Sequence, residues 1–259
     1  MHTRQALFLP EASDYIGGSP TESVSLCKPA ASSPFVLGLR DLARQHRLPI
    51  NVGIHEPSEH KDSKKIRNTL IWIDAKGEIT QRYQKLHLFD MDLSKDGGPK
   101  MKESDTIEAG KEIVPPFETD AGKVGMAICF DLRFPEISLS LKRQGADIIL
   151  YPSAFMPATG KAHWHALLCA RAIETECWVI ASAQVGAHNE KRTSYGHSLV
   201  VSPWGEIVGE LEGAEDKAKQ GDSWEPEIIV ADVKLEANEK MRRELPLLRR
   251  VYVVSLSHL

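Results

Sequence analysis

The chain is poor in the features that mark several broad classes of protein. Its four cysteines are irregularly spaced with no CxxC pair, which argues against a zinc site or a disulfide framework. No apolar run is long enough to span a bilayer, and the start "MHTRQALFLPEAS" lacks the apolar core of a signal peptide. The net charge is −4 without a basic excess, so neither nucleic acid nor a membrane surface is an expected partner.

What remains is an ordinary globular composition. Of the 259 residues, 42% are hydrophobic and 26% are charged, and this length suits one large α/β domain spanning residues 1–259. Sparse free thiols fit a reducing compartment. We therefore expect a cytoplasmic protein, with a mitochondrial form if the natural chain begins further upstream.

Short β-rich runs alternate with helical patterns, which predicts helices covering a sheet. Helical spacing of apolar residues favours helices at residues 35–46, 135–145 and 162–177. The region from 87 to 114 has no clean period, and a loop of this length is usually functional or disordered. Strands are predicted at residues 6–10, 50–56, 68–74, 78–84, 123–129, 147–153, 178–184, 197–203, 206–210 and 227–233.

Cys129 lies in "GMAICFDLRFPE", where a predicted strand ends at the thiol and a helix starts within about one turn. A buried free cysteine is most often a small core residue. A strand-to-helix elbow instead exposes a side chain at the rim of the sheet, near amides that stabilise a thiolate. Both interpretations are open on this stretch alone, whereas Cys169 and Cys177 fit core positions in a helical pattern. Cys27 lies in a Pro/Ser-rich loop.

A nucleophilic thiol needs a base and a stabiliser for the oxyanion. His87, His163, His165 and His197 are available, which keeps a Cys–His hydrolase open, although none is adjacent to Cys129 in sequence. His163 and His165 are two residues apart on a predicted helix, so they face different ways and cannot chelate one metal together. Structural histidines with satisfied hydrogen bonds are the plainer interpretation.

Two further ionisable residues follow predicted strands. Glu11 comes after "ALFLP", and Lys85 comes directly after "EITQRYQ". Either one alone reads as a solvated surface residue. Ligand sites in α/β sheets lie at strand carboxyl ends, however, so three reactive groups at three strand ends indicate a shared site.

The three stretches "FLPEASDY", "YQKLHLFD" and "GMAICFDLRFPE" resemble the glutamate, lysine and cysteine motifs of the nitrilase superfamily of carbon–nitrogen hydrolases, in the family's order. The resemblance continues through "SAFMPATGKAHWHALLCARAIET" and "GHSLVVSPWGEIV". Its wording is closest to the fungal deaminated glutathione amidases. The resemblance implies a four-layer α-β-β-α sandwich, a homodimer and no metal or organic cofactor.

The resemblance also implies catalytic roles. Cys129 attacks the amide carbonyl and forms a thioester, while Glu11 takes the thiol proton, passes one to the departing amine and later activates water. Lys85 and the Cys129 backbone N–H hold the oxyanion. Glu103, in "MKESD", matches a second family glutamate that supports the lysine.

The substrate implied by the resemblance is deaminated glutathione, which would give 2-oxoglutarate and cysteinylglycine. Arg133 could bind such an anion through its two-pronged guanidinium, although a surface ion pair is an equally good interpretation. Family members also suggest that Tyr15, Phe155 and Thr159 line the pocket. Another ω-amidase, a nitrilase or an N-carbamoyl amidohydrolase stay open, because all begin with attack by the same thiol.

The chain departs from the family pattern at its start. Only ten residues precede Glu11, where family members carry an additional strand and helix. Losing a helix that buries about five large apolar side chains would remove on the order of 10 kcal/mol and leave an exposed sheet edge. Either the first methionine is internal to a longer chain, or this is a shortened relative that binds a partner without catalysis.

Overall fold

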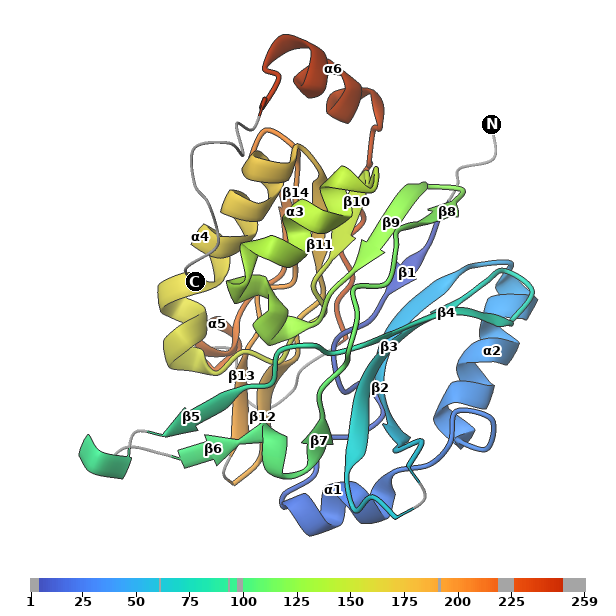
Figure 1. Ribbon diagram of the computed structural model, residues 1–259, viewed down its shortest axis with the longest axis vertical. Coiled ribbons are helices and arrows are strands. Elements are labelled where there is room, and N and C mark those ends of the chain that lie inside the picture. The colour runs from blue at the N-terminus through green and yellow to red at the C-terminus, as the bar shows by residue number, and fades with distance from the viewer. Residues whose placement is uncertain are drawn as a thin grey trace.

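The computed structural model describes residues 5–60, 62–92, 94–96, 100–190, 192–218 and 226–248. Two β-sheets pack against each other and helices lie on their outer faces (Figure 1). Helix α2 (Pro34–His46) covers the first sheet, while α3 (Pro135–Arg143) and α4 (Pro157–Thr175) cover the second. The α-β-β-α layering implied by the resemblance is therefore confirmed in the described residues.

The first sheet has the order β1-β2-β3-β4, with a short strand β7 added beside β3. Strand β1 runs parallel to β2, and each following neighbour is antiparallel. Strands β1 and β4 therefore run the same way, and their carboxyl ends share one edge of the sheet. The bounds are β1 (Leu7–Phe8), β2 (Ile50–Pro57), β3 (Ile66–Ile73), β4 (Ile79–Gln84) and β7 (Ile107–Glu108).

The second sheet has the order β15-β14-β11-β10-β9-β8. Its centre is parallel, since β10 pairs with both β9 and β11 in the same direction. Side chains of β10 and β11 are buried throughout, as expected for parallel strands covered on both faces. The bounds are β8 (Phe117–Thr119), β9 (Gly122–Met126), β10 (Ile148–Leu150), β11 (Trp178–Ala181), β14 (Leu199–Val201) and β15 (Ile207–Glu210).

The apolar core has two parts that follow from strand alternation. Leu7 and Leu9 pack with the cluster beneath α2, whereas Phe8 points into the space between the sheets and meets Trp72, with ring centroids 6.1 Å apart. Successive side chains of a strand point to opposite faces, so one short run of apolar residues serves both parts. This packing fixes the direction in which the chain leaves β1 toward Glu11.

Several elements were not predicted, because they are short or lack a clear apolar period. Strands β5 and β6 form a hairpin inside the region where no period was found, and β12 and β13 form another. The short strands β7 and β8 were also not predicted. The remaining additional elements are α1 (Pro20–Leu26), β5 (Asp90–Asp92), β6 (Lys100–Lys102), β12 (Val185–Asn189), β13 (Arg192–Tyr195), α5 (Ala214–Ala218), α6 (Glu236–Glu244) and the 3-10 turns η1 (Ser94–Asp96), η2 (Glu103–Asp105) and η3 (Cys129–Arg133).

The predicted strand at residues 227–233 is wrong. Residues 226–234 are assigned to neither strand nor helix. Ile229, Ala231 and Val233 pack against the core between and behind the sheets, while Ile228 and Val230 are 72% and 88% exposed. The alternation in the sequence therefore arises because one side of the segment packs against the core. It does not indicate hydrogen bonding to a neighbouring strand.

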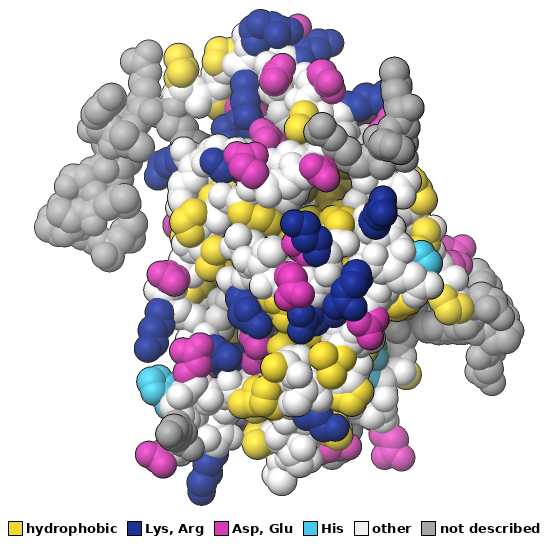
Figure 2. Space-filling model, turned by 90° about the vertical axis from the view of Figure 1, so that its right-hand side faces the viewer, with side chains coloured by type: hydrophobic (Ala, Val, Ile, Leu, Met, Phe, Trp, Pro, Cys, Tyr) yellow, Lys and Arg dark blue, Asp and Glu magenta, His cyan; other side chains and the backbone are white. Residues whose placement is uncertain are grey.

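Helix α2 lies on the side of the molecule that Figure 2 shows. Its Leu37 and Leu42 remain 39% and 48% exposed. In that view apolar side chains gather in the lower half of the face, and charged side chains of both signs cross its middle. Across the described ranges, no helix combines the length and apolar character that a bilayer crossing requires.

Candidate active site

Glu11 is carried on a tight turn just after β1. The next residue, Ala12, has a left-handed backbone with φ +53°. Gly53 of β2 lies so close that a Cβ there would stand 2.6 Å from the Glu11 Cα, which only glycine avoids. The Gln184 side chain, from the chain that leaves β11 of the second sheet, donates to the Glu11 carbonyl at 2.9 Å. Glu11 is thus fixed from both sheets, and it is only 4% exposed.

Lys85 comes directly after β4 and is 2% exposed. Its Nζ lies 2.9 Å from Glu11 Oε1 and 3.0 Å from both carboxylate oxygens of Glu103. The shared sheet edge that β1 and β4 reach explains why the glutamate and the lysine meet. The structure also places Glu103, which lies on η2, against the lysine, in the arrangement that the resemblance implied.

Asn68 on β3 completes this ion cluster and was not predicted. Its Nδ2 donates to Glu11 Oε1 at 2.7 Å and to Glu103 Oε1 at 3.3 Å. Its backbone carbonyl accepts from the Lys85 N–H at 3.0 Å. A buried asparagine inside the apolar strand "NTLIWI" was the available signal, because asparagine is depleted in strands.

Cys129 occupies an elbow between β9, which ends at Met126, and η3, which begins at the cysteine itself. Its backbone is left-handed, with φ +46°. Such a conformation costs about 1–3 kcal/mol in a non-glycine residue and is concentrated at functional sites. The predicted elbow is confirmed, except that the strand ends three residues earlier than expected. Cys129 retains 8% exposure.

Asp131 holds this elbow and was not predicted either. Its buried carboxylate accepts from the Ile128 N–H at 3.0 Å, the Tyr83 hydroxyl at 2.7 Å and the His87 backbone N–H at 2.9 Å. The three donors come from the elbow, from β4 and from the loop after β4. Asp131 therefore ties the cysteine turn to the segment that carries Lys85.

The Cys129 thiol lies close enough to the Glu11 carboxylate and to the Ala154 backbone N–H for both groups to influence its pKa. Burial and the negative charge of Glu11 raise the pKa of the Cys129 thiol above its ordinary value of 9.0, although Lys85 opposes the shift. The raised pKa favours a neutral thiol in the free site over a thiolate stabilised by helix amides, so the proton must be removed during attack.

The pKa of Glu11 is lowered even though burial opposes its ionisation, because the charge and hydrogen bond of Lys85 favour the carboxylate. Burial likewise opposes the charged form of Lys85, but Glu103 and Glu11 raise its pKa well above 10.5. The cluster thus pairs one ammonium with two carboxylates beside a thiol. A base next to a neutral nucleophile is what proton transfer during attack requires.

One predicted element of the oxyanion site is wrong. The Cys129 backbone N–H donates to the Pro152 carbonyl at 3.0 Å, so it is occupied. The next amide, that of Phe130, begins the first turn of η3, and no acceptor for it is found among the described residues. N–H groups in the first turn of a helix lack intrahelical partners, which leaves this one available to a ligand.

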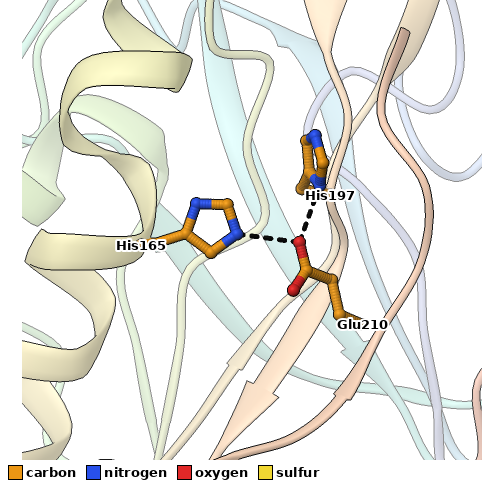
Figure 3. Close-up of side chains that lie close together, drawn as sticks. All are labelled: His165, His197 and Glu210. Atoms are coloured by element: carbon orange, nitrogen blue, oxygen red, sulfur yellow. Dashed lines mark hydrogen bonds and ion pairs between the residues drawn. The ribbon is translucent and has the colours of Figure 1, made fainter. Parts of the chain in front are cut away.

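The four candidate histidines are each engaged elsewhere. His87 contacts Asp131 at 2.9 Å, and His163 contacts Arg133 at 3.2 Å. His165 and His197 both contact Glu210, at 2.8 Å and 2.6 Å (Figure 3). The Cys–His alternative loses support, because Glu11 and not an imidazole lies beside the thiol. The pair around Glu210 is close enough to hold a metal ion.

The predicted substrate-binding residues fall into two groups. The Arg133 guanidinium lies over the rings of Phe130 and Phe155, at 5.6 Å and 5.7 Å. Thr159 lies in the first turn of α4, two residues into the helix, and donates to the Met156 carbonyl at 3.3 Å. Tyr15 is anchored by its own contacts, since its hydroxyl donates to the Ser23 carbonyl at 2.7 Å and its ring stacks on His55.

Comparison with known proteins agrees with this geometry. The model of the family described as "Carbon-nitrogen hydrolase" matches residues 5–243. The chain belongs to the carbon–nitrogen hydrolase family. The membership predicted from the three motifs is confirmed, and the protein is an amidase-type hydrolase of that superfamily.

Individual relatives support the assignment over most of the chain. "Probable hydrolase nit2" of Schizosaccharomyces pombe is 45% identical, covering 95% of this chain and 85% of its own. The deaminated glutathione amidase of Mus musculus is 42% identical over 92% of this chain and 70% of its own. The crystal structure of the Caenorhabditis elegans NitFhit protein matches with a TM-score of 0.81 and 38% identity, covering 93% of this chain and 55% of that fusion protein.

Proposed function

We propose that this carbon–nitrogen hydrolase cleaves deaminated glutathione into 2-oxoglutarate and cysteinylglycine through a thioester on Cys129. The observation that carries the proposal is the meeting of the Cys129 thiol with the Glu11 carboxylate and the Lys85 ammonium at one buried point. The substrate is suggested by relatives named deaminated glutathione amidase that are about 42% identical.

In the acylation step, the Cys129 thiol gives its proton to Glu11 as the sulfur attacks the amide carbonyl. The carbon–sulfur bond forms and the carbonyl oxygen takes the electron pair. Glu11 then returns the proton to the nitrogen of cysteinylglycine as the carbon–nitrogen bond breaks. An amine is a poor leaving group, so a carboxyl group that can both accept and donate the proton is needed.

The oxyanion would be held by Lys85 and the Phe130 backbone N–H. An ammonium has three donors. One reaches Glu11, and a second can be shared between the two Glu103 oxygens, which are equally distant at 3.0 Å. The third is left for the substrate. One such donor in a buried site is typically worth about 3–4 kcal/mol of transition-state stabilisation.

Deacylation reuses the same groups. Glu11 takes a proton from water, which attacks the thioester carbonyl, and 2-oxoglutarate leaves as the sulfur regains its proton. Glu103 and Asn68 keep Lys85 and Glu11 in place through both steps. Every proton is accounted for by Glu11, and the two products differ from the substrate by one water.

Arg133 is our proposed partner for the anionic end of the substrate, with Phe155, Thr159 and Tyr15 lining the pocket. The guanidinium is steadied by two aromatic faces and by His163, which leaves further N–H donors for a carboxylate. We also propose a homodimer in a reducing cytoplasmic compartment. The four cysteines are all free in the structure, which is consistent with that compartment.

A substrate panel tests this assignment. We expect turnover of deaminated glutathione and of 2-oxoglutaramate, and little or none of a nitrile or an N-carbamoyl amino acid. Arg133→Gln should raise KM for deaminated glutathione by about 10- to 100-fold, because a charge-assisted contact of roughly 1.5–3 kcal/mol is lost. It should change KM for an uncharged amide by much less.

The panel has clear opposing outcomes. Equal effects of Arg133→Gln on charged and uncharged amides would remove Arg133 from substrate recognition. Faster turnover of a nitrile or a carbamoyl compound would assign a different reaction to the same thiol. A folded protein that turns over no member of the panel would favour the non-catalytic relative.

A further inference from the structure

A second group of potential ligands lies outside the Cys129 site. His165 projects from α4, Glu210 ends β15, and His197 lies in the connection between β13 and β14 (Figure 3). One oxygen of Glu210 lies 2.8 Å from His165 Nε2 and 2.6 Å from His197 Nδ1. These three ligand atoms lie within 4.8 Å of one another. Segments far apart in the sequence thus aim two imidazoles at one carboxylate.

We propose that His165, His197 and Glu210 bind a divalent transition-metal ion of the zinc class. Two imidazole nitrogens and a carboxylate oxygen are a ligand set that Zn²⁺ prefers, with bonds of about 2.0–2.2 Å. Ligand atoms around a tetrahedral ion with such bonds stand about 3.3 Å apart. The contacts of Glu210 with His165 and His197, at 2.8 Å and 2.6 Å, would need to widen by about 0.5–0.7 Å to reach this spacing.

The backbone around His197 is built to present its ring. His197 itself has φ +60°, an uncommon conformation for a residue other than glycine. The Trp164 indole N–H fixes its carbonyl at 2.8 Å. A Cβ on Gly213 would stand 2.1 Å from His197 Nε2, so a glycine there leaves room for the imidazole.

The surroundings favour a cation. Among the described residues, the ion pairs of Glu210 are those to the two imidazoles, and no lysine or arginine is paired with it. Tyr195 lies beside the cluster, with its ring centroid 4.4 Å from that of His197 and 6.4 Å from that of His165. A metal ion would balance the negative charge of the Glu210 carboxylate.

Binding would require each imidazole to offer a lone pair where an N–H now faces Glu210. A neutral histidine does so when its proton moves to the other ring nitrogen. His165 and His197 would then coordinate through Nε2 and Nδ1, with solvent free to take the fourth position. The ion would tie α4 to β15 and to the chain before β14, so it would also stabilise the fold.

The experiment is a calorimetric titration of the purified full chain with Zn²⁺ after treatment with a chelator. We expect one ion per chain, and an affinity at least tenfold weaker in His165→Ala, Glu210→Gln and His197→Asn. Asparagine is chosen at position 197 because it tolerates the left-handed backbone. The melting temperature of the unmodified chain should rise with Zn²⁺ and return to its starting value when a chelator is added.

Two matched controls separate this site from adventitious binding. His163→Ala removes an exposed histidine two residues away on the same helix, and Cys169→Ser removes the thiol one turn along it. Both should bind Zn²⁺ as the unmodified chain does. Absence of binding to the unmodified chain, equal weakening in the controls, or undiminished affinity in His165→Ala with a normal melting transition would each overturn the proposal.

Discussion

Replacing Cys129 with alanine is expected to lower kcat/KM for deaminated glutathione by about 10⁴-fold or more. The substitution removes the atom that forms the thioester, and losses of this size follow removal of a covalent nucleophile. The Cys129 side chain is small and buried, and alanine fits the same space. The folded structure should therefore survive, as a normal melting transition would show.

The matched control is Cys169→Ser, a half-buried cysteine on α4 that takes no part in the site. Its kcat/KM should equal that of the unmodified chain. If Cys129→Ala kept its activity, or if Cys169→Ser lost as much, the assignment of the nucleophile would be wrong. Titration of reactive thiols before the assay measures any unmodified enzyme in the preparation of the variant, so its activity can be subtracted.

Glu11→Gln is expected to lower kcat by about 10²- to 10⁴-fold, because the base that serves both half-reactions is lost. The variant should fold, since it leaves the Lys85 ammonium paired with the single charge of Glu103. Replacing Lys85 instead would leave the buried Glu11 carboxylate and the partly buried Glu103 carboxylate without their cation, which typically costs several kcal/mol. Glu56→Gln provides a control, because Glu56 is also buried but lies on β2 away from the thiol.

The pH dependence of alkylation by iodoacetamide sharpens this prediction. In the unmodified chain the reactive pair is a Glu11 carboxylate with a neutral thiol. The pKa of Glu11 is held below 4.5 and that of Cys129 above 9.0, so the rate should be flat between those values. In Glu11→Gln the negative charge that raised the thiol pKa is gone, so this pKa should fall and the rate should climb with pH.

An inflection near the ordinary thiol pKa in the unmodified chain, with no change in Glu11→Gln, would contradict the coupling of the two groups. So would unchanged turnover in Glu11→Gln beside a loss in Glu56→Gln. Each variant replaces one carboxylate oxygen with an amide nitrogen. Any difference in activity between the two variants therefore reflects the position of the glutamate and not the kind of substitution.

Much of the site could be predicted because its three reactive residues sit at strand ends. Glu11, Lys85 and Cys129 each follow an apolar run whose boundary the sequence displays. What brings them together is the parallel direction of β1 and β4 and the face-to-face packing of two sheets. Local sequence patterns show neither which strands pair nor how the two sheets pack. The convergence of the three residues was therefore first implied by the resemblance and then seen in the structure.

The missed features are long-range or depend on backbone geometry. Asn68 acts through side-chain hydrogen bonds to partners 57 and 35 residues away. Besides its local bond to Ile128, Asp131 has partners 48 and 44 residues away. The occupied N–H of Cys129 could not be foreseen, because its acceptor, Pro152, lies on another strand end. The false strand at residues 227–233 shows the converse error, since alternation reports which side chains are buried and not whether a ladder forms.

The central claim is that the acyl group of the substrate passes through Cys129. Its most direct test is rapid quenching in acid during turnover of deaminated glutathione, followed by mass analysis of proteolytic peptides. We predict an adduct equal to 2-oxoglutarate less one water on the peptide that contains Cys129, appearing before product and vanishing after substrate is exhausted. Turnover without any such adduct, or an adduct confined to another residue, would contradict the account.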